Sequence, residues 1–416
     1  METTPINPIN AGDTAWVLAS TALVLLMTVP ALALFYGGMV RRKNILGVFM
    51  QCFVCLALVS ILWVVLGYSL AFGKGTPFIG GLDWFMLKGV GQDANADYAA
   101  TIPHLAFMIF QCMFAVITPA LIIGSFAERM KFSSFLVFTS LWLLLVYCPI
   151  AHMVWAVGGH LRTMGALDFA GGTVVHINAG IAGLVTALYL GKRIGHTEKP
   201  GMHNVPFIVI GAALLWFGWF GFNAGSALGA GGLAAHAFVT TNTATAAAAL
   251  SWALMEWIFA GKPTMVGVVS GAVAGLVAIT PACGFVDIGG SLWIGLLVSV
   301  FCYCMVAFVK PKLGYDDTLD AFGIHGIGGL WGALATGIFA TKLVNSAGAD
   351  GLLLGNGAQL WNQFVACAVT IGYTAVATWV ICFVIDKVMG LRVSQEDEVM
   401  GLDLTQHHER AYTILD

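Results

Sequence analysis

Two histidines, His176 and His325, lie inside apolar, glycine-rich stretches of the chain. Each is followed by glycines four and seven positions further on: Gly180 and Gly183, and Gly329 and Gly332. An ionisable side chain inside a hydrophobic span is costly and marks a functional site, and two at equivalent positions of an internal repeat predict one shared site. Neutral imidazoles that hydrogen-bond each other can line a narrow pore and pass a proton near neutral pH.

The same residue types permit other roles. A single histidine of this kind would pack between helices, with a ring nitrogen bonded to a backbone carbonyl, as readily as it would line a pore. The repetition of the pattern favours the pore-lining role. We predict no metal site, because neither a cysteine nor a carboxylate stands at ligand spacing near either histidine. In a haem protein or a membrane enzyme, the two histidines could serve as ligands of a cofactor that absorbs visible light. We expect that the protein has no cofactor and is not an enzyme.

Composition indicates the elements that position the histidines. Apolar residues make up 59% of the 416 residues, charged residues 9%, and the mean hydropathy is +0.88. At about 20 residues per crossing, this predicts an all-α membrane protein with eleven transmembrane helices. The spans are 15–39, 46–72, 103–127, 133–155, 169–190, 205–228, 237–260, 264–282, 289–309, 318–341 and 361–386.

Lysine and arginine gather at alternate connections between the spans. Fourteen of the eighteen fall on one side: Arg41, Arg42, Lys43, Arg129, Lys131, Lys192, Arg193, Lys199, Lys262, Lys310, Lys312, Lys387, Arg392 and Arg410. The positive-inside rule therefore puts the N-terminus outside and the C-terminus in the cytoplasm. Glu256, about two turns from Lys262, is expected to pair with that lysine or to reach the membrane surface.

The histidine pattern also predicts the architecture. If it marks the fifth and tenth spans as equivalent, each repeat holds five helices, spans 1–5 and 6–10, and a final helix follows. An odd number of helices makes the second repeat cross the membrane in the opposite sense, with a pathway between the two halves. The two histidine rings then approach the membrane midplane from opposite sides.

Four segments carry a resemblance that covers the whole chain. They are DFAGGTVVHINAGIAGLVTALYLGKR at 168–193, GWFGFNAGSA at 218–227, FGIHGIGG at 322–329 and GLRVSQEDEVMGLD at 390–403. With these the chain resembles the ammonium transporter family, which microbes and plants share and which is related to the Rhesus proteins. The resemblance implies a homotrimer of eleven-helix protomers, each with its own pore, that carries ammonium inward across the plasma membrane, or the inner membrane of a Gram-negative cell.

The resemblance also implies roles for single residues. His176 and His325 are similar to the family's twin pore histidines, and Phe114 and Phe222 resemble its stacked phenyl gate. Trp155 and Ser226 resemble its outer ammonium recruitment site, and Asp168 matches the aspartate near that site. An aromatic face attracts a cation by about 0.5–2 kcal/mol. Since Asp168 precedes an apolar helical run, we expect it to cap the helix and to support recruitment indirectly.

Ammonium would thus be recruited outside and deprotonated, and ammonia would pass the histidines with or without the proton; methylammonium would serve as an analogue. We expect a transmembrane domain at 1–390 and a cytoplasmic tail at 391–416, whose composition is typical of a solvated arm. The resemblance implies that the tail packs under the trimer and that a PII-type regulatory protein is a possible partner. Nothing indicates a nucleic-acid partner. The alternative function is an ammonium sensor with little net transport.

Overall fold

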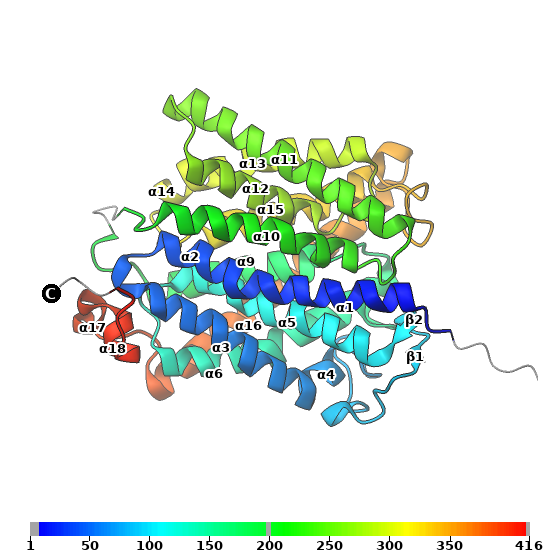
Figure 1. Ribbon diagram of the computed structural model, residues 1–416, viewed down its shortest axis with the longest axis horizontal. Helices are drawn as coiled ribbons and strands as arrows, with labels where there is room; N and C mark the ends of the chain where they lie inside the picture. Colours follow the sequence, from blue (N-terminus) through cyan, green and yellow to red (C-terminus); the bar gives the residue numbers. More distant parts are fainter. Residues whose placement is uncertain (1–7, 197–200, 413–416) are drawn as a thin grey trace, which may run out of the picture.

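The computed structural model describes residues 8–196 and 201–412, so Lys199 lies outside the described residues. The chain folds as one helical bundle, as Figure 1 shows. Within the described residues, ten helical segments are long and apolar enough to cross a membrane. The predicted all-α membrane fold is confirmed, and the remaining predicted span, 264–282, is present as a shorter helix.

Helices α1 to α9 form the first five spans, and several are interrupted by one π-helical turn. They are α1 (Ala11–Leu26) running into α2 (Ala33–Met39), α3 (Ile45–Leu62) into α4 (Tyr68–Phe72), α5 (His104–Phe126), α6 (Phe132–Trp142) into α7 (Cys148–Trp155) and then α8 (His160–Met164), and α9 (Asn178–Leu190). Between α1 and α2, Val29 leaves the helical conformation just before Pro30. A proline disfavours helical geometry in the preceding residue, which explains the break there.

Helices α10 to α15 form the next five spans, and α16 is the final one. They are α10 (Val205–Gly225), α11 (Gly232–Ala260), α12 (Met265–Ile279), α13 (Ile288–Cys304) running towards α14 (Lys310–Leu313), α15 (Ile327–Phe339) and α16 (Gly357–Met389). The predicted span 264–282 corresponds to α12, which has 15 residues. Because Pro281 lacks a backbone N–H, the helix gives way to buried turns after Ile279.

Side-chain caps fix the starts of several helices. Asn10 accepts a hydrogen bond from the backbone N–H of Asp13 at the start of α1. The Thr264 hydroxyl accepts one at the start of α12, and the Asp287 carboxylate accepts one from Gly290 at the start of α13. Each cap satisfies an N–H group that has no partner inside its own helix.

The two halves meet through glycines of α9 and α15. A methyl group on Gly180 would overlap the backbone at Gly326, directly after His325, and a methyl group on Gly329 would lie 2.9 Å from the Cβ of His176. Each glycine thus lets one helix approach the histidine turn of the other half. These reciprocal contacts fit the inverted five-helix repeat.

The first and last described helices lie at opposite ends of the bundle (Figure 1). Helix α1 begins at the same end as the small antiparallel pair β1 (Ala94–Asn95) and β2 (Ala99–Pro103), whereas the tail helices α17 (Gln395–Met400) and α18 (Leu402–His407) lie at the other end. Short 3-10 turns occur at Arg42–Asn44, Phe85–Leu87 and Leu352–Leu354. Eleven crossings require this separation of the ends.

A buried charge network ties the loops together at the tail end. The Glu128 carboxylate accepts hydrogen bonds from Arg41 at 3.0 Å and Arg193 at 2.9 Å, and Asp316 accepts one from Arg193 Nε at 2.8 Å. Burial acts to raise the pKa of Asp316, but the hydrogen bonds from Arg193 and the charge of Arg129 hold it well below its usual range. Loops from both halves are therefore joined at this end.

The tail packs against the same loops. The Glu398 carboxylate accepts hydrogen bonds from the backbone N–H of Ile194 at 2.6 Å and from Arg392 at 2.7 Å. Asp403 accepts one from the backbone N–H of Gly47, in the first turn of α3. The expectation of a solvated arm is wrong for these two carboxylates, because Glu398 is 1% exposed and Asp403 is 4% exposed.

Candidate functional site

The two histidines face each other at the centre of the bundle. Their ring centroids are 5.4 Å apart and the ring planes differ by 15°. His176 belongs to the π-helical turn Gly172–Ile177 and His325 to the corresponding turn Phe322–Gly326, and both side chains are buried. Within the described residues, both ring nitrogens of His176 and the Nδ1 atom of His325 have no hydrogen-bond partner. The pair thus presents polar atoms to an otherwise apolar space.

An aspartate positions each histidine turn from eight residues upstream. The carboxylate of Asp168 accepts hydrogen bonds from the backbone N–H groups of Gly171, Gly172 and Thr173 at 2.6–2.8 Å, and from the Thr173 hydroxyl. Removal from water raises the pKa of Asp168, although these donors oppose the shift. The geometry agrees with the expected cap, which anchors the start of the turn that carries His176.

Asp317 occupies the equivalent place before His325. Its carboxylate accepts hydrogen bonds from the backbone N–H groups of Ala321 at 3.2 Å and Phe322 at 2.8 Å, and from the Ser125 hydroxyl at 2.7 Å. Burial raises its pKa to about 6, against the opposing charge of Lys310. Asp317 was not among the residues predicted to belong to the site. The common eight-residue spacing, Asp168 to His176 and Asp317 to His325, was the available signal.

Stacked aromatic rings lie on one side of the histidine pair. The centroids of Phe114 on α5 and Phe222 on α10 are 4.3 Å apart with 28° between the ring planes. Trp155, at the end of α7, meets Phe114 edge-on at 5.9 Å, and Phe222 lies 6.1 Å from the ring of His176. The residues expected to form the gate and part of the recruitment site therefore form one continuous series that leads to the histidines.

A cavity of about 410 Å³ opens beyond these rings, and its lining includes the turn between β1 and β2. Its lining includes Phe114, Trp155, Asp168 and Ser226, and we call it the outer cavity. The Trp155 indole donates to the backbone oxygen of Asp168 at 3.0 Å, and the Ser226 hydroxyl donates to that of Phe222 at 2.8 Å. Because its own proton is engaged, the Ser226 oxygen can accept a hydrogen bond from a molecule in the cavity.

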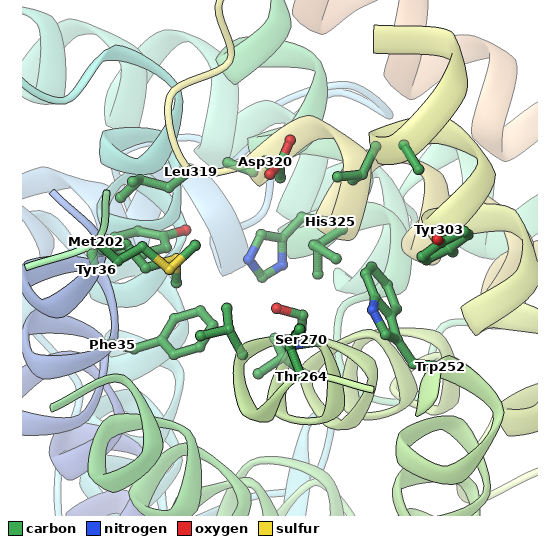
Figure 2. Close-up of a pocket in the computed structure, with 18 of the residues that line it drawn as sticks. Phe35, Tyr36, Met202, Trp252, Thr264, Ser270, Tyr303, Leu319, Asp320 and His325 are labelled. Carbon is green, nitrogen blue, oxygen red and sulfur yellow. The ribbon is translucent and has the colours of Figure 1, made fainter. Parts of the chain in front are cut away.

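A second cavity, of about 470 Å³, lies on the other side of the histidine pair and is called here the inner cavity. Figure 2 shows His325 at its centre, with Tyr36, Ser270 and Trp252 around it. Glu256 also lines the cavity, and its carboxylate accepts hydrogen bonds from the backbone N–H and the hydroxyl of Thr264. The stacked rings and the histidine pair thus lie between the outer and the inner cavity.

Sequence reasoning also missed Trp219. Its ring stacks on His176 at 5.4 Å with 21° between the planes, and its indole N–H donates to the Thr280 hydroxyl at 2.9 Å. Trp219 precedes Phe222 by one helical turn, so both rings lie on the same face of α10. Among thirteen tryptophans, nothing in the local sequence distinguishes this one.

Comparison with known proteins places the chain in a family. Residues 15–412 match the sequence model described as "Ammonium Transporter Family". The chain belongs to the ammonium transporter family. An ammonium transporter of Bacillus subtilis is 55% identical over 401 residues, which cover 96% of this chain and 98% of that protein. One of Aquifex aeolicus is 53% identical, with 98% of this chain and 94% of that protein covered.

Solved structures agree with this assignment. Mep2 of Candida albicans is 35% identical, with a TM-score of 0.89, and the match covers 99% of this chain and 92% of that one. A structure described as "Sensor Amt Protein" is 27% identical, with a TM-score of 0.86, and covers 95% of this chain and 98% of that one. The Bacillus subtilis and Aquifex aeolicus relatives are ammonium transporters and not enzymes, and this family member is a multi-pass membrane protein.

Proposed function

We propose that the protein is an ammonium transporter that recruits ammonium in the outer cavity and conducts ammonia past His176 and His325 into the inner cavity. The observation that carries the proposal is the unbroken series of rings between the two cavities. It runs from Trp155 through Phe114 and Phe222 to the histidine pair. Family membership supports the substrate.

Recruitment combines two interactions in the outer cavity. The faces of Trp155 and Phe114 attract a cation by about 0.5–2 kcal/mol, depending on how dry the site is. The Ser226 oxygen accepts a hydrogen bond from ammonium, which potassium cannot donate. Asp168 contributes indirectly, because its oxygens are engaged by the helix start that they cap. The site therefore favours ammonium over a metal cation of equal charge.

Passage beyond the stacked rings favours the neutral form. Phe114 and Phe222 are each at most 1% exposed, and a lone ion loses its hydration there without compensation. Ammonium gives up its proton before this point, and ammonia continues to the histidines. Their ring nitrogens offer a donor or an acceptor according to tautomer, so a neutral pair can hydrogen-bond the passing molecule. The proton either stays outside or crosses separately.

The remaining assignments rest on family membership and on the charge distribution. We propose a homotrimer in the plasma membrane, or in the inner membrane of a Gram-negative cell, with the N-terminus outside and the tail in the cytoplasm. Residues 1–390 form the transmembrane domain and residues 391–416 the cytoplasmic tail. The tail end of the bundle, which carries the charge network and α17, is the surface that a PII-type regulator would contact.

Electrical recording tests the transport proposal. Purified protein in liposomes under an inward ammonium gradient should give a current that methylammonium reproduces in part and potassium does not. Electroneutral ammonia passage would instead change the internal pH without a current. Ammonium binding with neither current nor pH change would reject transport and favour a sensor, the alternative that the similarity to the solved sensor protein makes worth testing.

A further inference from the structure

The inner cavity contains a buried donor to which the pathway described above assigns no task. Trp252, on α11, is 4% exposed and lines the inner cavity together with His325 and Ser270. Within the described residues, its indole nitrogen has no hydrogen-bond partner. Figure 2 shows this nitrogen on the edge of the ring that faces the cavity, towards Ser270.

Packing holds the ring of Trp252 in this orientation. Tyr303 meets it edge-on at 5.7 Å. On another side, α12 approaches so closely at Gly271 that a methyl group there would overlap the first side-chain carbon of Trp252. A ring fixed in this way cannot readily turn to find another acceptor. Because buried indole N–H groups normally find a partner, an unpaired one on the wall of a cavity points to a ligand that binds there.

The two carboxylates that line the inner cavity already accept hydrogen bonds from other groups. The Glu256 carboxylate accepts hydrogen bonds from Thr264, and Asp320 accepts one from Lys310 at 2.6 Å. The lining is mostly apolar, with aromatic rings from several helices. Such a space suits a small neutral molecule better than an ion.

Ammonia and ammonium differ in the property that an indole N–H detects. Ammonia has one lone pair and accepts a hydrogen bond, whereas ammonium has four N–H groups and no lone pair. The indole N–H only donates. It therefore stabilises the neutral form and offers nothing to the cation.

We propose that the Nε1–H group of Trp252 donates a hydrogen bond to ammonia, or to methylamine, in the inner cavity and so forms an exit subsite next to His325. This subsite rests on the proposed function, since it requires that the neutral form reaches the inner cavity. It makes Trp252 a substrate-binding residue that lies beyond the histidine pair.

The test is the variant Trp252→Phe, which keeps an aromatic ring and removes the N–H. Trp216→Phe is the matched control, because the Trp216 indole nitrogen is also buried without a partner among the described residues but does not line the inner cavity. Ammonium flux is measured in everted vesicles, where the inner cavity faces the bath, and in right-side-out vesicles. Loss of one neutral hydrogen bond raises the half-saturation concentration about two- to tenfold.

The proposal expects this increase for Trp252→Phe in everted vesicles, a smaller one in right-side-out vesicles, and none for the control. An equal increase in both vesicle orientations, an equal increase in both variants, or no increase would overturn the proposal. So would a half-saturation concentration that, as the bath pH changes, stays constant in terms of ammonium and not in terms of ammonia. If Trp252→Phe fails to fold, the isosteric analogue benzothienylalanine at position 252 removes only the N–H. His325→Ala, measured in parallel, tests the proposed function separately, because unchanged flux in that variant rejects the pore itself.

Discussion

Removal of the Asp168 carboxylate should lower the stability of the folded protein, because the carboxylate caps a helix start. It should not remove a direct contact with ammonium. Asp168→Ala leaves the backbone N–H groups of Gly171, Gly172, Thr173 and Val174 without their acceptor, together with one hydroxyl. Loss of an N-cap costs about 0.5–2 kcal/mol, and loss of the negative charge at the helix start adds about 0.3–1 kcal/mol. Because the site is partly buried, we expect about 3 kcal/mol at the upper end of these ranges.

Thermal melting of the purified variant measures this loss. At the unfolding entropy typical of globular domains, about 2.1 cal/mol/K per residue, 3 kcal/mol in a chain of this length corresponds to about 3 °C. Transport in liposomes should fall as well, because the turn that carries His176 loses its anchor. Asp287→Ala is the control, since Asp287 caps α13 away from the histidines. It should lower the melting temperature by about 1 °C and leave transport intact.

An Asp168→Ala protein that melts like the wild type but transports nothing would refute this reasoning. The carboxylate would then act on ammonium directly. Asp168→Asn refines the test. Asparagine keeps one acceptor oxygen but turns an NH₂ group towards backbone donors, so it should recover only part of the lost stability.

Three further outcomes follow from the structure. Phe222→Ala removes one of the two stacked rings, and a potassium current that the wild type lacks should appear in liposome recordings; continued exclusion of potassium would argue against a gate. Since burial raises the pKa of Asp317 to about 6, the folded state binds this proton more tightly than the unfolded state. Stability should therefore fall as the pH rises from about 4 through 6, and Asp317→Asn should flatten that dependence of the melting temperature on pH. An unchanged dependence in the variant would contradict the assignment. Glu398→Ala leaves Arg392 and the N–H of Ile194 without this acceptor, so limited proteolysis should cleave the tail several-fold faster, whereas equal cleavage would show that Glu398 does not hold it.

Much of the fold follows from apolar segment length alone. The predicted spans agree with the helices to within a few residues at most ends, because the cost of exposing backbone polar groups to lipid forces each apolar stretch into a helix. The end of the span at 264–282 was harder to predict, since the apolar stretch continues through Pro281 whereas the helix ends at Ile279. The inverted repeat was predictable because one histidine pattern occurs twice.

The site was only partly predictable, because its contacts connect distant segments. The histidines are visible as ionisable residues in apolar spans, whereas Trp219 and Trp252 look like any other tryptophan until the helices are assembled. Glu256 shows the limit of local reasoning. Its spacing suggested either pairing with Lys262 or reaching the membrane surface, yet its carboxylate accepts hydrogen bonds from Thr264 at the start of α12. The identity of a partner across a turn depends on backbone geometry that spacing does not encode.

The most direct test of the proposed pathway is the ammonium current of His176→Ala and His325→Ala in liposomes, with potassium as the competing ion. The account predicts that each variant, while melting close to the wild type, loses ammonium current or admits potassium, because each removes one of two facing polar rings from the pathway. Unchanged current and unchanged selectivity in both variants would contradict it.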